Sequence, residues 1–232
     1  MNPICVALDT PDLERAAQLA RELKGAVGHV KLGMEFFYAH GPRGYEKVAR
    51  EGVPVFLDLK LHDIPNTVAQ GLTSLLRLDP VPSILNVHAS GGRPMLAAAA
   101  EAVAGRAKLI AVTILTSLSD GDIHEAGYDP ARKTAEQARD MARLVRDCGL
   151  DGVVCSPLDV AGIKQATAKG FLAVVPGIRP AEASVGDQKR IATPEAAIAA
   201  GADILVIGRP ITGAADPVAA AHAILAGIRH AG

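Results

Sequence analysis

Short apolar segments alternate with longer segments of helical periodicity along the whole chain. The apolar segments are rich in β-branched residues and end at polar or turn-forming positions, which predicts buried strands. The eight predicted strands are Ile4–Leu8, His29–Leu32, Val55–Leu57, Ile84–Val87, Leu109–Ile114, Gly152–Val154, Leu172–Val175 and Ile204–Ile207. Each is followed by a segment long enough for a helix, so the chain is read as repeated strand–helix units.

Apolar residues between the strands recur at three- and four-residue spacing, as on one face of a helix. The pattern runs through residues 13–23, 68–76 and 138–148. Two helix starts show Thr followed by Pro, at Thr10-Pro11 and at Thr193-Pro194. This pair is typical of an N-cap followed by an N1 proline.

Eight strand–helix units within 232 residues predict a single-domain (β/α)₈ TIM barrel spanning residues 1–232. A doubly wound sheet remains the alternative, because alternation alone does not show that the sheet closes. Two connections, Thr116–Pro130 and Gly177–Ile191, are longer than the others. The second carries glycines and cationic residues, which suits a lid that closes over an anionic ligand.

Charged residues gather where the first three predicted strands end. Asp58 and Lys60 are two residues apart, so they project to the same face of their strand, and Asp9 and Lys31 lie on the two preceding strands. Burying these charges in a core would cost several kcal/mol per ion unless each were paired. Because barrels carry their chemistry at the carboxyl ends of the strands, the four residues predict a catalytic site.

The other side of the predicted barrel mouth is rich in glycine, and its strand ends carry arginine as their charged residue. Gly208-Arg209 follows the last strand, and Arg179 follows the seventh. Backbone N–H groups after strands seven and eight commonly bind phosphate in this architecture. The two sides together predict a small phosphorylated ligand with its reacting atoms over strand three.

Structural explanations also exist for these residues. Asp58 and Lys60 could form a purely structural ion pair, and Lys31 could pair with Glu35 at i+4. Asp63 could be the N-cap of the next helix, with Pro65 near N1. Arg179 and Arg209 could be solvated surface charges. We treat His62, His88 and His124 as surface or packing residues, of which His88 is the best placed to line a pocket.

Composition narrows the class of protein. The formal net charge is −1 and there is no basic stripe, which argues against nucleic acid as a partner. No apolar stretch reaches the roughly 20 residues of a membrane span, and the N-terminus has no signal-peptide pattern. The three cysteines, Cys5, Cys148 and Cys155, lack metal-site spacing and are read as buried thiols. We expect a cytoplasmic protein.

Residues 58–67, Asp-Leu-Lys-Leu-His-Asp-Ile-Pro-Asn-Thr, closely resemble the DxKxxDIPxT signature of the orotidine 5′-phosphate decarboxylase family. The likeness extends over nearly the whole chain. Further matching segments are 6–9, 30–33, 86–92, 112–117, 176–180, 186–190 and 207–211. The chain looks like the short, bacterial type of this family.

The resemblance implies decarboxylation of orotidine 5′-monophosphate (OMP) to uridine 5′-monophosphate (UMP) without a metal or organic cofactor. It implies that Lys60 protonates C6 of the pyrimidine, that Asp58 lies against the departing carboxylate, and that Lys31 and Asp9 contact the ribose. Asp63 and Thr67 are expected to reach into the site of a partner subunit in a homodimer. Expected ligand contacts of the remaining positions are Thr116 with the pyrimidine, Gln188 with base and phosphate, and Arg179, Gly208 and Arg209 with the phosphate.

Three rival functions remain at this point. A 3-keto-gulonate 6-phosphate decarboxylase would share the Asp-x-Lys strand but use magnesium, and Lys31 stands where that relative is expected to have an acidic ligand. A sugar-phosphate isomerase or epimerase would lack a lid carrying a residue such as Gln188. A non-enzymatic ligand-binding barrel would have no use for the intact Asp58, Lys60 and Asp63.

Overall fold

The computed structural model describes residues 2–180 and 191–230. Within these ranges eight parallel strands close into a barrel in the order β1 to β8, and β1 pairs with both β2 and β8. The strands are β1 Ile4–Ala7, β2 His29–Gly33, β3 Val55–Leu61, β4 Ile84–His88, β5 Lys108–Val112, β6 Gly152–Val154, β7 Leu172–Val175 and β8 Ile204–Ile207. The predicted barrel is confirmed, and the doubly wound sheet is excluded because the sheet has no open edge.

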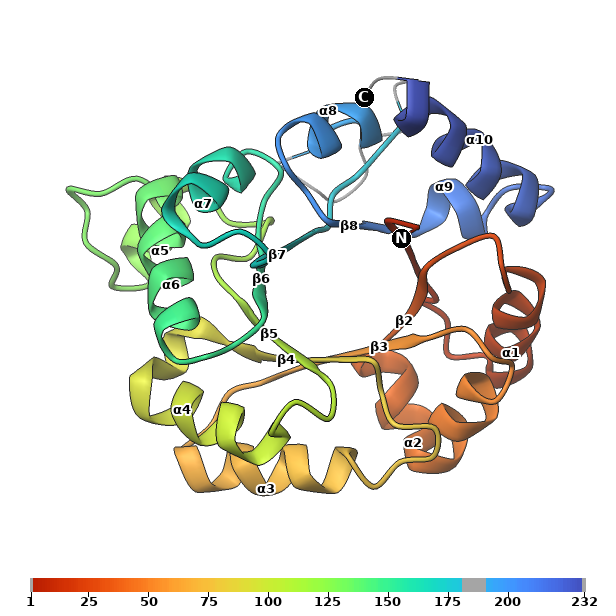
Figure 1. Ribbon diagram of the computed structural model, residues 1–232, viewed down its shortest axis with the longest axis horizontal. Coiled ribbons are helices and arrows are strands. Elements are labelled where there is room, and N and C mark those ends of the chain that lie inside the picture. Colours follow the sequence, from red (N-terminus) through yellow and green to blue (C-terminus); the bar gives the residue numbers. More distant parts are fainter. Residues whose placement is uncertain (1, 181–190, 231–232) are drawn as a thin grey trace.

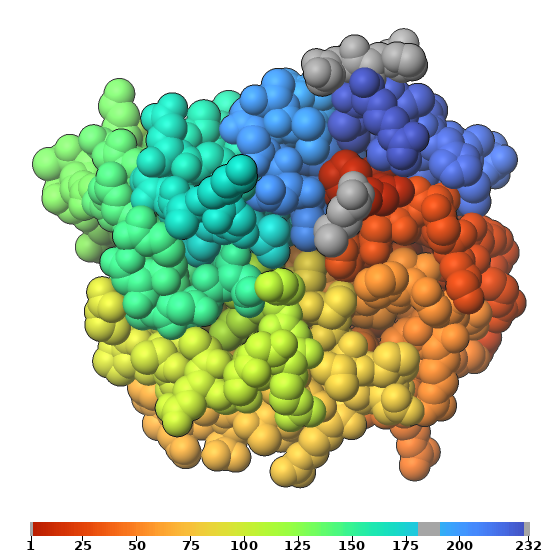
Figure 2. Space-filling view, in the orientation of Figure 1, coloured from red at the N-terminus to blue at the C-terminus, as the bar shows by residue number. Residues whose placement is uncertain are grey.

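Helices surround the barrel (Figure 1). They are α1 Leu13–Glu22, α2 Met34–Ala49, α3 Pro65–Leu75, α4 Gly92–Val103, α5 Asp120–Glu125, α6 Thr134–Asp147, α7 Val160–Ala166, α8 Pro194–Ala199, α9 Arg209–Thr212 and α10 Pro217–His230, with a 3₁₀ turn η1 at Ala89–Gly91. In Figure 2 the red N-terminal segment lies against the blue C-terminal segment, as the pairing of β1 with β8 requires. No helix of the described residues is both long and apolar enough to cross a membrane.

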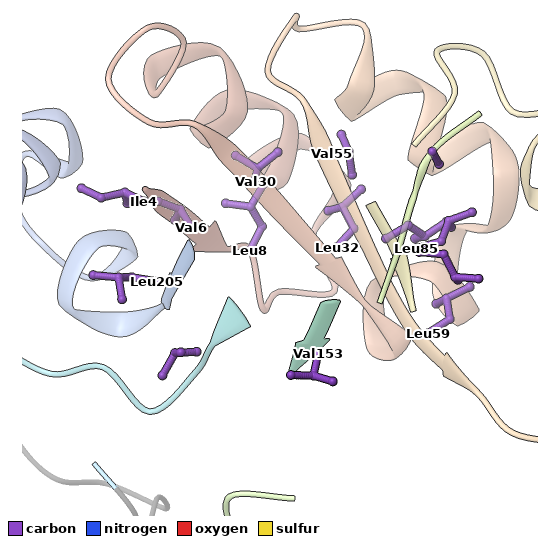
Figure 3. Packing of buried hydrophobic residues seen from close by; sticks show 14 of the residues in the cluster. Ile4, Val6, Leu8, Val30, Leu32, Val55, Leu59, Leu85, Val153 and Leu205 are labelled. Atoms are coloured by element: carbon purple, nitrogen blue, oxygen red, sulfur yellow. The ribbon is translucent and has the colours of Figure 1, made fainter. Parts of the chain in front are cut away.

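The strands alternate between two buried layers. One face of β1, with Ile4 and Val6, packs into the large core between sheet and helices, and the other, with Cys5 and Ala7, fills the barrel interior. Figure 3 shows the outer layer, in which Val30 and Leu32 of β2 lie beside Val55 of β3. This period of two, set by the pleat of a strand, decides which side chains reach the barrel mouth.

Outside β3, the strand ends agree with the sequence prediction to within two residues, and β6, β7 and β8 have the predicted bounds. At β3 the strand continues to Leu61, because Leu61 pairs with Val87 of β4 beyond an irregularity in the register. The predicted strand stopped at Leu57, where the polar residues begin. The charged residues of β3 therefore belong to the strand itself rather than to the loop after it.

One of the two predicted helix caps is confirmed and one is wrong. The Thr193 side chain accepts a hydrogen bond from the backbone of Ala196, and Pro194 occupies the first turn of α8. In α1 the cap is Asp12, whose carboxylate accepts hydrogen bonds from the N–H groups of Glu14 and Arg15. An ionised carboxylate accepts more strongly than a hydroxyl and also suits the positive end of the helix.

Two further predictions need correction. The connection Thr116–Pro130 is not a plain loop, because it contains α5, which begins with a capping box between Ser119 and Asp122. Cys5 and Cys155 are buried as expected, whereas Cys148 is only partly buried.

Candidate active site

A cavity of about 580 Å³ opens at the carboxyl ends of the strands. Its floor includes Ala7, Phe56 and Val206 of the inner layer. Eight residues singled out from the sequence line it: Asp9, Lys31, Asp58, Lys60, Thr116, Arg179, Gly208 and Arg209. The barrel therefore brings together the acidic, basic and glycine-rich strand ends around one space.

The pleat of β3 explains how two charges enter a largely apolar barrel. Leu57 and Leu59 point outward into the core beneath the helices, while Phe56 belongs to the inner layer. Asp58 and Lys60 continue the inward-facing series above Phe56 and line the cavity. The sequence places apolar residues where the barrel is filled and charged residues where it opens.

Four charged side chains form a continuous array along one wall. The Lys31 Nζ lies 3.2 Å from an Asp9 oxygen and 3.3 Å from Asp58 Oδ2. The Lys60 Nζ lies 2.7 Å from the other oxygen of Asp58, Oδ1. Acid and base alternate, so each charge has an opposite charge as its neighbour.

Asp58 and Lys31 are the buried members of the array, with 9% and 11% of their side chains exposed. Burial alone would raise the pKa of Asp58, but the charges of Lys31 and Lys60 and hydrogen bonds from Lys60 and Asn86 lower it below its usual value. Burial likewise opposes the charge of Lys31, but Asp58 and Asp9 raise the pKa of this ammonium. Both groups are therefore held charged at neutral pH.

The backbone of Lys60 adopts a left-handed conformation with φ of 53°. This region costs a residue other than glycine roughly 1–2 kcal/mol. The Lys60 N–H donates to Asn86 Oδ1 at 2.8 Å, and Asn86 Nδ2 donates to Asp58 Oδ1 at 2.7 Å. Asn86, on β4, thus contacts both the backbone of Lys60 and the carboxylate of Asp58.

The segments after β7 and β8 form the neighbouring part of the cavity wall, because β8 pairs with β1. The backbone N–H of Arg179 donates to the carbonyl of Ala192 at 3.0 Å, which ties the segment after β7 to the segment before α8. Gly208 lies close to Asp9, since a Cβ placed on Gly208 would come within 3.8 Å of an Asp9 oxygen. Arg209 follows at the start of α9 and is exposed. Cationic and backbone groups therefore line the cavity beside the Asp9 end of the charged array.

Comparison with known proteins identifies the family. The model of the orotidine 5′-phosphate decarboxylase / HUMPS family matches residues 2–224. The chain is 52% identical to an orotidine 5′-phosphate decarboxylase of Novosphingobium aromaticivorans, over 96% of this chain and 97% of that protein. It is 47% identical to the enzyme of the same name from Paramagnetospirillum magneticum, over 97% and 98% of the two chains. The chain belongs to this decarboxylase family.

Solved structures agree with this assignment. The crystal structure of an orotidine 5′-phosphate decarboxylase from Lactobacillus acidophilus superposes with a TM-score of 0.85 at 37% identity, covering 98% of this chain and 99% of that one. The same enzyme from Pyrococcus horikoshii gives a TM-score of 0.79 at 25% identity, over 97% and 99% of the chains. The resemblance read from residues 58–67 is therefore confirmed at the level of the family.

Two residues of the family signature lie outside the cavity of their own chain. Asp63 and Thr67 are exposed, and neither lines the cavity found among the described residues. Asp63 is not the N-cap of α3: the cap position is Ile64, and the Asp63 carboxylate accepts the N–H of Ile64 at 2.6 Å. Both side chains face solvent beside an Ile64 that is 67% exposed.

The structure also decides between alternatives for other positions. Lys31 pairs with Asp9 and Asp58 rather than with Glu35. The ring of His88 lies against that of His62, with centroids 5.3 Å apart, so the two histidines have each other as partners. His124 bonds the carbonyl of Arg132. The predicted ligand residue Gln188 and most of the predicted lid lie outside the described residues.

Asn86 is the site residue whose role the sequence reading missed. It appeared there only within the predicted strand Ile84–Val87 and the matching segment 86–92. The available signal was its spacing, because Asn86 follows Ile84 by two residues and Ile84 belongs to the inner layer. An amide at the next inward-facing position had to lie near the charges of β3.

Residues 2–180 and 191–230 contain no candidate metal-binding cluster. No group of three or more His, Cys, Asp or Glu side chains is placed there to hold a metal ion. The carboxylates of Asp9 and Asp58, which a cation could have used, are each in contact with Lys31.

Proposed function

We propose that this chain decarboxylates OMP to UMP, the last step of de novo pyrimidine synthesis. The observation that carries the proposal is the alternating array of Asp9, Lys31, Asp58 and Lys60 in a cavity that Arg179 and Arg209 also line. The family assignment over nearly the whole chain supports it. A nucleoside monophosphate has the matching polarity, with a phosphate at one end and the reacting carbon at the other.

In the proposed mechanism Lys60 is the catalytic cation and proton donor. Loss of carbon dioxide leaves negative charge in an sp² orbital at C6, which conjugation cannot readily spread. A fixed ammonium beside this carbon stabilises the developing charge, the more strongly because the closed site excludes water. The same ammonium then donates a proton to C6. Its position next to Asp58 supports this role, because the acid keeps it at the cavity wall before substrate arrives.

Asp58 is proposed to lie against the departing carboxylate. With its pKa lowered by Lys31 and Lys60, the group is ionised when an anionic substrate binds. Two carboxylates side by side repel each other, and the repulsion disappears as carbon dioxide leaves. Lys31 compensates the negative charge of Asp58. Together with Asp9 it is proposed to contact the ribose.

The phosphate is proposed to bind beside the Asp9 end of the array, to Arg179, Arg209 and the backbone near Gly208. Thr116 is proposed to hydrogen-bond the pyrimidine, and Gln188 to bridge base and phosphate. Binding energy from such remote contacts can serve the chemical step by closing the site around the reacting carbon.

We further propose a homodimer with shared active sites. Asp63 and Thr67 cannot serve the cavity of their own chain in the observed conformation, because both are exposed and outside its lining. In a dimer with two-fold symmetry, each subunit would present these residues to the other. We also propose that residues 1–232 form one catalytic domain that acts in the cytoplasm without a metal or organic cofactor.

A magnesium-dependent decarboxylase of a sugar phosphate is the rival within the same superfamily. The ammonium of Lys31 at the centre of the acidic side chains disfavours a divalent cation there. The experiment that tests the proposal is an absorbance assay of the purified chain on OMP, run with and without a chelator. Conversion to UMP at equal rates in both supports it, no conversion of OMP in either favours the rival, and loss of activity with chelator would overturn the absence of a metal cofactor.

A further inference from the structure

Asn86 is a buried amide in the middle of β4, between Leu85 and Val87, with 1% of its surface exposed. An amide in such a place costs about 1–3 kcal/mol if its hydrogen bonds are not made. An apolar residue would fill the same space at no such cost. An amide at this position is therefore stable only where neighbouring groups accept from its amino group and donate to its carbonyl oxygen.

The two ends of the amide bind two different parts of β3. The carbonyl oxygen accepts the backbone N–H of Lys60 at 2.8 Å, and the amino group donates to Asp58 Oδ1 at 2.7 Å. This chemistry fixes the orientation of the amide, because a carboxylate only accepts and a backbone N–H only donates. A closed ring of contacts results, since Lys60 Nζ binds the same Asp58 oxygen at 2.7 Å.

The ladder between β3 and β4 explains why the N–H of Lys60 needs a side chain. Leu57 pairs with Leu85 and the next pair is Leu61 with Val87, so four residues of β3 are set against two of β4. Lys60 falls in this irregular stretch with its left-handed φ of 53°. The carbonyl of Asn86's side chain takes the place of the strand acceptor that the irregular register removes.

We propose that Asn86 is a positioning residue: it holds the left-handed backbone of Lys60 and one oxygen of Asp58, and thereby sets the ammonium of Lys60 against the reacting carbon. This inference rests on the proposed function of Lys60 and Asp58. Asn86 and Lys60 both bind Oδ1 of Asp58, while Lys31 lies against Oδ2. By holding Oδ1, Asn86 keeps each lysine next to its own oxygen of the carboxylate. When the ammonium moves toward substrate, the amide keeps Asp58 from turning after it.

The first test compares Asn86→Ala with a matched control, Ser83→Ala. Ser83 precedes the same strand, and its hydroxyl donates to the carbonyl of Val55 on β3 at 2.8 Å, far from the charged array. We expect Asn86→Ala to lower kcat about 10²-fold, the usual effect of a small misplacement of a reacting group. Its affinity for UMP, which lacks the departing carboxylate, should stay within about threefold of wild type. Ser83→Ala should keep wild-type kcat.

A second variant, Asn86→Asp, remains informative if Asn86→Ala does not fold. It keeps the acceptor for Lys60 but sets a second carboxyl against Asp58, in an environment that also contains Lys31, Lys60 and, beyond them, His62 and His88. Protonated, the introduced carboxyl can donate to Asp58 as the amide does. The ratio of its kcat to that of wild type should therefore fall as pH rises.

Hydrogen exchange at the Lys60 amide separates this proposal from the proposed function. Loss of its acceptor in Asn86→Ala should speed exchange at this amide about tenfold, whereas Asn86→Asp should keep it protected. The exchange result stands even if the wild-type chain does not act on OMP. An unchanged kcat in Asn86→Ala, an equal loss in Ser83→Ala, a pH-independent ratio, or unaltered exchange would each overturn the positioning role.

Discussion

The Lys31 ammonium lies 3.3 Å from the Asp58 carboxylate, and about nine-tenths of each side chain is buried. The same ammonium lies 3.2 Å from Asp9, whose side chain is 64% exposed. Lys31 thus connects a buried acid, which depends on it for charge compensation, with a largely exposed one. Its removal should affect stability as well as activity.

Replacing Lys31 by Met should therefore destabilise the protein. The variant leaves Asp58 buried with only Lys60 and Asn86 as partners, and we expect the free energy of unfolding to fall by roughly 1–3 kcal/mol. Lys47→Met is the matched control, because Lys47 pairs with Glu14 on the exposed surface and should change stability by less than about 1 kcal/mol. Urea unfolding of both variants measures the difference, and equal stability would show that Asp58 does not depend on Lys31.

The lowered pKa of Asp58 predicts a contribution to acid unfolding. Lys31 and Lys60, with two hydrogen bonds, outweigh burial and hold this pKa below its usual value of 3.8. The stabilisation is complete above the unfolded-state pKa and is lost as pH falls through the lower folded-state value. Asp58→Asn should flatten the dependence of unfolding free energy on pH below about pH 4, by up to about 1.4 kcal/mol per pH unit. Parallel curves for variant and wild type would contradict this.

Arg209 should act on the phosphate and not on the base. A charged hydrogen bond is worth about 1.5–3 kcal/mol, so Arg209→Ala should raise the KM for OMP about 10- to 10²-fold. Orotidine, which has no phosphate, should be processed equally by variant and wild type. Arg43→Ala, at an exposed arginine of α2, is the control. A loss with orotidine as large as that with OMP would place Arg209 elsewhere in the mechanism.

Shared active sites predict recovery of activity in mixtures. Asp63→Ala subunits keep Lys60, and Lys60→Ala subunits keep Asp63, so a mixed dimer contains one site with both residues intact. After equal mixing and subunit exchange, about a quarter of all sites should be intact. Absence of recovery, in a sample where native mass spectrometry shows mixed dimers, would mean that each chain completes its own site.

The sequence predicted the barrel well because the pattern that encodes it is local. A strand buried on both faces is a short apolar run, and each of the eight runs became a strand. The register of one strand against the next is not local. The extension of β3 to Leu61 and the left-handed backbone of Lys60 depend on pairing with β4, which no single run contains.

The site shows the same division. Asp58 and Lys60 were found from their spacing within one strand, and the pleat placed them as expected. The spacing of Asn86 from Ile84 indicates only that its side chain faces inward, whereas its contacts with Lys60 and Asp58 arise between strands and depend on the register of β3 against β4. Asp63 was first open to interpretation as a helix cap, and the structure rejects this, because Ile64 holds the cap position.

The most direct test of the central claim is OMP turnover by wild type and Lys60→Ala, with UMP affinity measured in parallel. The account predicts that wild type converts OMP to UMP equally with and without chelator. It predicts that Lys60→Ala loses at least about 10⁴-fold in kcat, because charge stabilisation and proton donation are lost together, while UMP still binds. Appreciable turnover by Lys60→Ala, or a wild-type chain inactive on OMP, would contradict it.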